Sequence, residues 1–112
     1  MNINGVEFDD VIKDAIKAAT VVFSEGADNL VDIVKNIGDS LVCDIEFVAK
    51  KKLSGEFEEV DARVFLEDQK VVARMRLRSL AIITMKIAED IWNAIVHVFN
   101  SAINQALGWT LL

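Results

Sequence analysis

The chain has 112 residues, of which 53% are hydrophobic and 27% are charged. A chain of this length is typical of one domain with a single core, and its composition is that of a folding chain rather than a disordered one. Its net charge of −6 repels phosphate backbones. We therefore expect one acidic domain over residues 1–112, with no nucleic acid among its partners.

The single cysteine, Cys43, excludes an intrachain disulfide and any paired zinc-ligand spacing. The first ten residues are acidic and polar, where a secretory signal would be basic and then apolar. Residues 91–112 carry no formal charge if His97 is neutral, but their amide and hydroxyl side chains argue against a membrane span. We expect a cytoplasmic protein without a metal or another cofactor.

The first part of the chain has the spacing of amphipathic helices. Apolar residues recur at helical spacing over residues 8–23, with Asn4 as the predicted N-cap and Gly26 as the predicted stop. A second helix is predicted over residues 28–38 and ends at Gly38. Because the apolar register continues through Gly26, one longer, bent helix is the alternative.

After Gly38 the pattern changes to alternation of apolar and polar residues, which is typical of β-strands. Three segments follow it: residues 41–50, 59–66 and 71–79. A turn at Ser54-Gly55 and another at residues 67–70 would join them into an antiparallel meander. Residues 80–85 fit both strand and helix, and we assign them mainly to the third strand.

Arg74, Arg76 and Arg78 occupy alternate positions of this third segment. In the register of the predicted meander, Asp61 faces Arg76 and Glu59 faces Arg78 on the outer side of the sheet. Surfaces that bind nucleic acid usually add stacking aromatics and lack neighbouring carboxylates. The arginines are therefore interpreted as members of a mixed-charge, solvated face.

Helical spacing returns from about Lys86 and holds to Leu107, with Gly108 as the predicted terminator. Apolar residues cover roughly 200° of this helix, twice the arc that a surface helix needs. The helix must therefore be covered from two sides, and any part left open would be a contact site.

The remaining polar stripe of this helix becomes uncharged toward its C-terminal half, where amides and an imidazole are easier to dehydrate than charges. We predict that the chain self-associates, or docks a protein partner, through this half and the following segment. The predicted interface residues are Asn93, Val96, His97, Asn100, Asn104, Trp109, Leu111 and Leu112. Burial of these residues within their own chain is the alternative. Lys86 is the one cation on the polar stripe, which argues against a membrane surface.

Three groups of side chains are candidates for catalysis. His97 has no carboxylate three or four residues away, and Cys43, predicted on the inner strand face, has no identifiable base. Glu56 and Glu58 lie near Lys51 at the open end of the predicted sheet and read more simply as solvated charges. These observations favour a protein that is not an enzyme.

The predicted fold class is α+β: two N-terminal helices, a three-stranded antiparallel meander, and a long C-terminal helix packed on one sheet face. The alternative is an all-α helical hairpin or bundle that turns at Ser54-Gly55. The expected function is a non-enzymatic interaction or assembly module, a homo-oligomer or a binder of another protein. The alternative function is a carrier that holds a small apolar ligand between sheet and helices.

Overall fold

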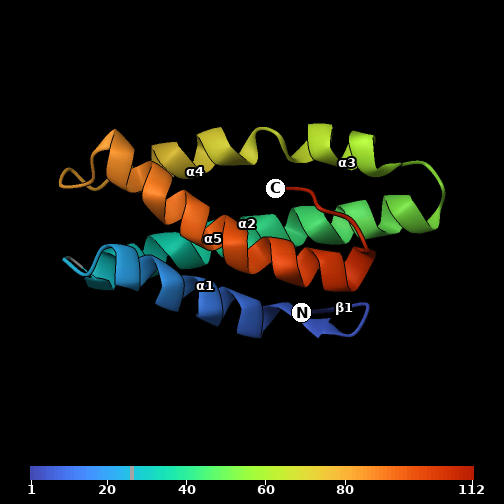
Figure 1. Cartoon of the computed structure of the whole chain (residues 1–112), viewed down its shortest axis with the longest axis horizontal. Coiled ribbons are helices and arrows are strands. Elements are labelled where there is room, and N and C mark those ends of the chain that lie inside the picture. Colours follow the sequence, from blue (N-terminus) through green and yellow to red (C-terminus); the bar gives the residue numbers. More distant parts are fainter. Residues whose placement is uncertain (26) are drawn as a thin grey trace.

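A computed structural model describes residues 1–25 and 27–112, so the predicted stop at Gly26 lies outside the described residues. In chain order the elements are β1 (Asn2–Ile3), β2 (Val6–Glu7), α1 (Phe8–Val22), α2 (Ala27–Leu53), α3 (Glu59–Leu66), α4 (Gln69–Leu77) and α5 (Met85–Leu107). They form an elongated bundle of 44 × 24 × 17 Å (Figure 1). The chain is mostly helical, which matches the all-α alternative and contradicts the predicted α+β class.

Helix α1 packs on α2 and on α5, and α4 also packs on α2 and α5. Figure 1 shows α3 and α4 following one another along one edge of the bundle. We call residues 59–77 the α3–α4 arm. This arm takes the place of the fourth helix of a bundle.

The N-terminal residues form a β-hairpin with two residues in each strand rather than a helix cap. Asn2 pairs with Glu7 and Ile3 with Val6 in an antiparallel ladder. Asn4 and Gly5 form its turn with φ angles of 51° and 88°, the left-handed values that a tight hairpin requires. The predicted N-cap at Asn4 is therefore wrong, and the side chain of Glu7 caps α1 by accepting the N–H of Asp9.

Gly38 does not end a helix, as predicted, but lies inside the 27-residue helix α2. Its backbone approaches α1 so closely that an added Cβ would stand 3.0 Å from Cγ1 of Ile12. Glycine is present here because it has no side chain to separate the two helices.

The predicted meander is wrong because its three segments are helical. Residues 41–50 belong to α2, where Leu41, Ile45 and Val48 are buried at a spacing of four and three residues. Residues 59–66 are α3 and residues 71–77 lie in α4. The predicted turn at Ser54-Gly55 is present, but it joins two helices, with Gly55 at a φ of 78°.

The cross-strand charge pairs disappear with the sheet. Arg76 donates to the hydroxyl of Ser40 in place of the expected pair with Asp61, and Arg74 pairs with Glu89 at 3.2 Å. Glu59 pairs with Arg63 one helical turn away at 3.6 Å. Arg78 has no ion-pair partner within the described part of the chain.

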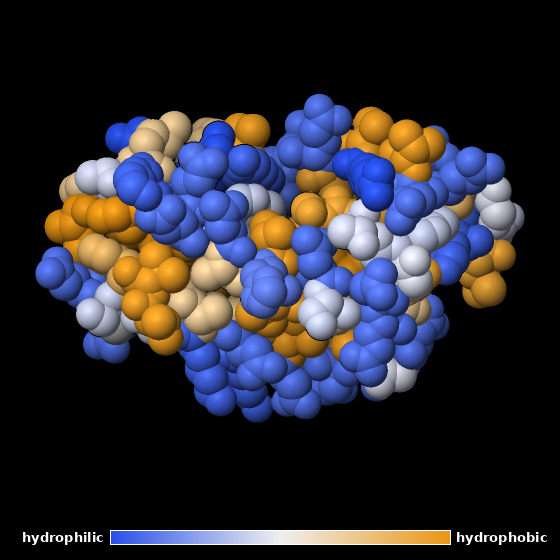
Figure 2. All heavy atoms as spheres, in the orientation of Figure 1, coloured by the Kyte–Doolittle hydropathy of each residue, from blue (hydrophilic) through white to orange (hydrophobic). Residues whose placement is uncertain are grey.

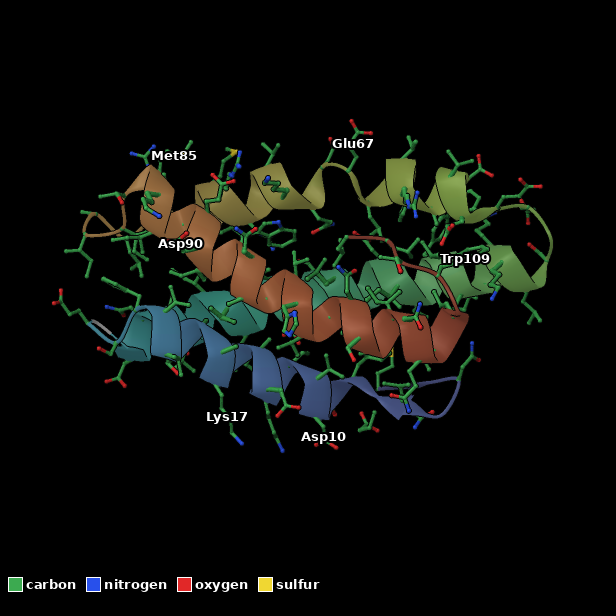
Figure 3. All side chains as sticks on the ribbon, viewed as in Figure 1. Asp10, Lys17, Glu67, Met85, Asp90 and Trp109 are labelled. Atoms are coloured by element: carbon green, nitrogen blue, oxygen red, sulfur yellow. The ribbon has the colours of Figure 1, made fainter. Side chains whose placement is uncertain are left out.

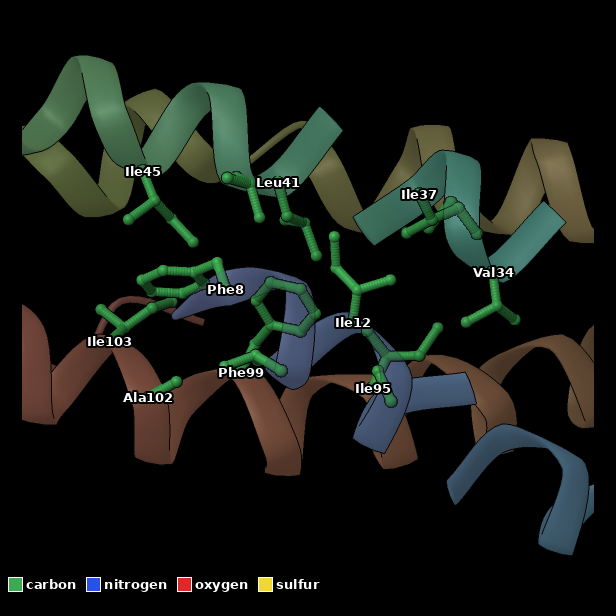
Figure 4. Close-up of a cluster of buried hydrophobic side chains, with 14 of the residues drawn as sticks. Phe8, Ile12, Val34, Ile37, Leu41, Ile45, Ile95, Phe99, Ala102 and Ile103 are labelled. Carbon is green, nitrogen blue, oxygen red and sulfur yellow. The ribbon is translucent and has the colours of Figure 1, made fainter. Parts of the chain in front are cut away.

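The C-terminal helix is placed as predicted, from Met85 to Leu107, with Gly108 at a φ of 74° as its C-cap. Residues 80–84 form a loop rather than a strand, and Thr84 caps α5 by accepting the N–H of Ile87. The core lies where α5 meets α1 and α2 (Figure 4). It includes Phe8, Ile12, Val34, Ile37, Leu41, Ile45, Ile95, Phe99, Ala102 and Ile103.

Candidate functional site

The outer side of the α3–α4 arm carries a row of solvent-exposed apolar side chains. Val60, Val64, Val71 and Met75 are exposed by 60%, 62%, 54% and 70%. We call these four residues the outer stripe. Single exposed apolar residues are ordinary on protein surfaces, but a row of them on one helical face marks a contact site.

A second apolar row holds the arm to its own bundle. Ala62, Leu66, Ala73 and Leu77 are all buried. At about 100° per residue, this inner row and the outer stripe lie about 160° apart around the helix axis. The arm therefore has two apolar faces, and its own chain covers the inner one.

The outer stripe continues across the break between α3 and α4. Asp68 and Glu67 keep right-handed helical backbone angles, and the N–H of Val72 donates to the carbonyl of Asp68 at 3.0 Å. Glu67 points outward from this break (Figure 3). Because the backbone stays close to helical, the four side chains stay on one side of the arm.

The spacing of the outer stripe reads the same in both chain directions. Successive members, from residue 60 to residue 75, are four, seven and four residues apart. If a second arm lay antiparallel to the first, Val60 would face Met75 and Val64 would face Val71, twice over. In a contact between two identical chains about a two-fold axis, residue i contacts residue j and residue j contacts residue i. The spacing of the outer stripe suits such a contact.

Apolar atoms gather on the surface over α3 and at the end of the molecule where the α4–α5 loop lies (Figure 2). Near that end, α4 and the start of α5 border an open depression of about 410 Å³. Val71, Met75 and Met85 supply its apolar walls, and Arg74 and Arg78 supply its cationic rim. The apolar surface thus widens beyond the outer stripe.

The structure divides the interface residues predicted on the last helix. Asn93, His97 and Asn104 are exposed on α5, and Val96 is half-buried. Most of the apolar surface of α5 is covered by its own chain. Self-association through these positions stays a prediction.

The other predicted interface residues come together in space. Asn100 contacts Leu112 through two hydrogen bonds, Leu111 is buried, and Trp109 is half-buried beneath Lys52. Glu59 and Arg63 on α3 form hydrogen bonds with the backbone of Thr110, between these residues. They are not among the predicted interface residues because the sequence pattern assigns both to a strand.

The candidate catalytic groups lie apart or on the open surface. His97, Asp14 and Ser101 line one open depression of about 360 Å³, but no hydrogen bond or ion pair joins them among the described residues. Cys43 is exposed rather than facing the core, so that prediction is wrong. Within the described ranges, no three His, Cys, Asp or Glu side chains group as metal ligands.

Glu56 takes part in a local charge cluster rather than a pair of carboxylates. Its side chain accepts hydrogen bonds from Lys51 at 2.9 Å and from Ser54 at 2.9 Å. These bonds, the one from Lys51 first, lower the pKa of the Glu56 carboxyl. Glu58 instead precedes α3, where its N–H donates to Asp61.

The surface depressions also concern the alternative function, a carrier that encloses a small apolar ligand. Another depression, of about 560 Å³, lies between the N-terminal hairpin and the end of α2, and it opens to solvent like those described above. Of the helices in the described chain, none combines the length and the apolar character that crossing a bilayer requires. The chain matches no family model, no curated protein and no solved structure.

Proposed function

We propose that this chain is a non-enzymatic assembly module in which two copies pack their α3–α4 arms antiparallel through the outer stripe. The observation that carries the proposal is the exposed row of Val60, Val64, Val71 and Met75, whose spacing is the same when read from either end. Such a row gives each copy the same surface that it meets on the other.

A second copy fits the outer stripe better than a charged partner does. The four side chains carry no charge, so the contact between them comes from apolar burial. Each chain carries a net charge of −6, and two copies repel one another at long range. Added salt screens this repulsion and should strengthen pairing of two copies, whereas it would weaken the docking of an acidic partner on the arginines.

The size of the arm sets the strength of the contact. At the rise of an α-helix, the arm, with 8 residues in α3 and 9 in α4, spans roughly 28 Å. One helix face of that length is smaller than the roughly 800 Å² per partner of a stable complex. We therefore expect a reversible dimer with a Kd on the order of tens of micromolar.

The test is sedimentation equilibrium of the full chain over a range of protein and salt concentrations. The average mass should rise with concentration from that of one 12.4 kDa chain toward twice that value. Substituting Val64→Asp or Val71→Asp should hold it at the monomer value, since each places a carboxylate in the apolar contact.

Val21→Asp is the matched control, because Val21 is an exposed helical valine on α1, away from the arm. It should leave the mass unchanged. Monomers at all concentrations up to about 1 mM, or equal effects of the three substitutions, would contradict the proposal.

A further inference from the structure

The four residues after Gly108 lie between α3 and α5 rather than extending from the bundle. Figure 1 shows this segment turning back from the end of α5 and running beneath α3, and Figure 3 labels Trp109 at its start. We call residues 109–112 the tail segment. It belongs to no helix or strand.

The wall formed by α3 holds the backbone of Thr110 at both of its polar groups. The N–H of Thr110 donates to Oε2 of Glu59 at 3.2 Å, and its carbonyl accepts from Nε of Arg63 at 2.9 Å. Glu59 and Arg63 are themselves ion-paired. The two side chains are thus held in place beside the backbone of residue 110.

The wall formed by α5 holds the backbone of Leu112 in the same way. The N–H of Leu112 donates to Oδ1 of Asn100 at 3.0 Å, and its backbone oxygen accepts from Nδ2 of Asn100 at 2.9 Å. Between these two contacts, the side chain of Leu111 is buried. The Lys52 ammonium stands 4.8 Å from the centre of the Trp109 ring.

This arrangement is the one by which proteins bind extended peptides. Every second residue is held through its backbone, and the side chain between them enters the protein. The contacts to Thr110 and Leu112 use main-chain atoms, so other residues could make them equally well. The specificity lies in the aliphatic side chain at position 111.

We propose that the groove between α3 and α5 is a peptide-binding site of this chain. Its ligand is an extended segment of a partner protein with a large aliphatic side chain at the position of Leu111. The tail segment fills the groove as an internal stand-in for that ligand. The site is separate from the outer stripe and does not depend on self-association.

The tail segment can leave without unfolding the bundle. Its release breaks four hydrogen bonds from side chains to backbone and uncovers the buried Leu111 and the partly buried Trp109 and Leu112. The other core residues on α1, α2 and α5 keep their contacts with one another. A tethered segment competes at an effective concentration on the order of millimolar. A partner segment of equal intrinsic affinity must therefore reach about millimolar concentration to displace it, and a more dilute one must bind correspondingly more tightly.

The test uses the full chain and a fluorescein-labelled, amidated peptide, Gly-Trp-Thr-Leu-Leu. Substituting Leu111→Asp should release the tail segment and leave the groove free. In fluorescence anisotropy the variant should bind the peptide at least tenfold more tightly than the original chain does. A peptide with Asp in place of the first leucine should not bind.

A second substitution ties the binding to the groove. Adding Asn100→Ala to the L111D chain should abolish peptide binding, whereas Asn93→Ala, an exposed amide on the same helix, should leave it intact. Far-UV circular dichroism checks that each variant is helical, and Leu111→Ala replaces L111D if that variant unfolds.

Equal affinity of the original chain and the helical L111D or L111A variant would overturn the proposal, and so would equal binding of both peptides. Dimers of the original chain that L111D abolishes and V64D does not would also overturn it. In that case a second copy, not a partner protein, would supply the segment. Dimers that V64D abolishes bear on the outer stripe alone.

Discussion

Ile12 on α1 and Gly38 on α2 are in such close contact that a Cβ at position 38 would lie 3.0 Å from Cγ1 and 3.3 Å from Cγ2 of Ile12. A larger side chain at position 38 must push the two helices apart. We expect Gly38→Leu to lower the free energy of unfolding by about 1–3 kcal/mol, measured by urea denaturation.

Shortening the facing side chain should relieve the clash. In an Ile12→Ala background, the cost of Gly38→Leu should fall by about 1 kcal/mol or more, which a double-mutant cycle measures. Additive effects of the two substitutions would show that they do not share this contact.

Asp44 and Gln69 join α2 to the start of α4 by a hydrogen bond from the Gln69 amide to the Asp44 carboxylate. Burial raises the pKa of the Asp44 carboxyl, and the hydrogen bond from Gln69 offsets only part of that effect. The folded chain therefore holds the Asp44 proton more tightly than the unfolded chain does. The charged form opposes folding.

Asp44→Asn should raise the free energy of unfolding at pH 7, because asparagine keeps an acceptor for Gln69 without the charge. The sign follows from the raised pKa: the penalty is absent below the ordinary aspartate pKa of about 4 and sets in as pH rises through the folded value. The gain of D44N over the original chain should thus grow with pH. Asp32→Asn, at an exposed carboxylate on the same helix, should show no such trend.

The helices at both ends of the chain could be predicted from the spacing of apolar residues, but the helices in the middle of the chain could not. In the arm, alanines and leucines occupy the inner row while valines and a methionine occupy the outer stripe. Two apolar faces on one helix place apolar residues at alternate positions, as in Ala62, Val64 and Leu66, which is also the pattern of a strand. The features that suggested a sheet are thus the ones that create the exposed surface.

The N-terminal hairpin could be predicted from local sequence more fully than the groove between α3 and α5. The Asn4-Gly5 pair is the strongest short hairpin signal, and it could have been recognised. The groove could be predicted only in part: Asn100, Leu111 and Leu112 were grouped from the pattern of the last helix. Glu59 and Arg63 join them through a helix that had been assigned as strand, so no local signal placed them there.

An aromatic cluster fastens α3 to α2. The rings of Phe47 and Phe65 are stacked with their centres 4.8 Å apart, and Phe57 lies 6.0 Å from each. Phe65→Ala should cost about 1–2 kcal/mol, less than for a fully buried ring, because Phe65 is 39% exposed.

The loss should be local, since Phe47 and Phe65 are 40% and 39% exposed and lie outside the buried core. Hydrogen exchange should speed up at the amides of α3 while those of α5 keep their protection. Uniform acceleration over both helices would mean that α3 opens only with the whole bundle.

In the proposed dimer, Glu67 and Asp68 of both copies lie near the two-fold axis, midway between Val64 and Val71. Like charges this close oppose association. Replacing them with Gln and Asn should lower the Kd severalfold in low salt, and this gain should vanish near 1 M salt, where the Debye length is about 3 Å. Sedimentation at both salt concentrations measures the effect, and an unchanged Kd in low salt would place the axis elsewhere.

Disulfide trapping tests the central claim, the antiparallel pairing of two arms, most directly. Cys43 is replaced with serine, and chains carrying Val64→Cys and Val71→Cys are mixed and oxidised. In the proposed pairing residue 64 of one copy faces residue 71 of the other, within reach of a disulfide, whereas two residues 64 lie roughly 10 Å apart along the axis. Cross-linked dimers should form faster in the mixture than in either chain alone, and equal rates in all three samples would contradict the pairing.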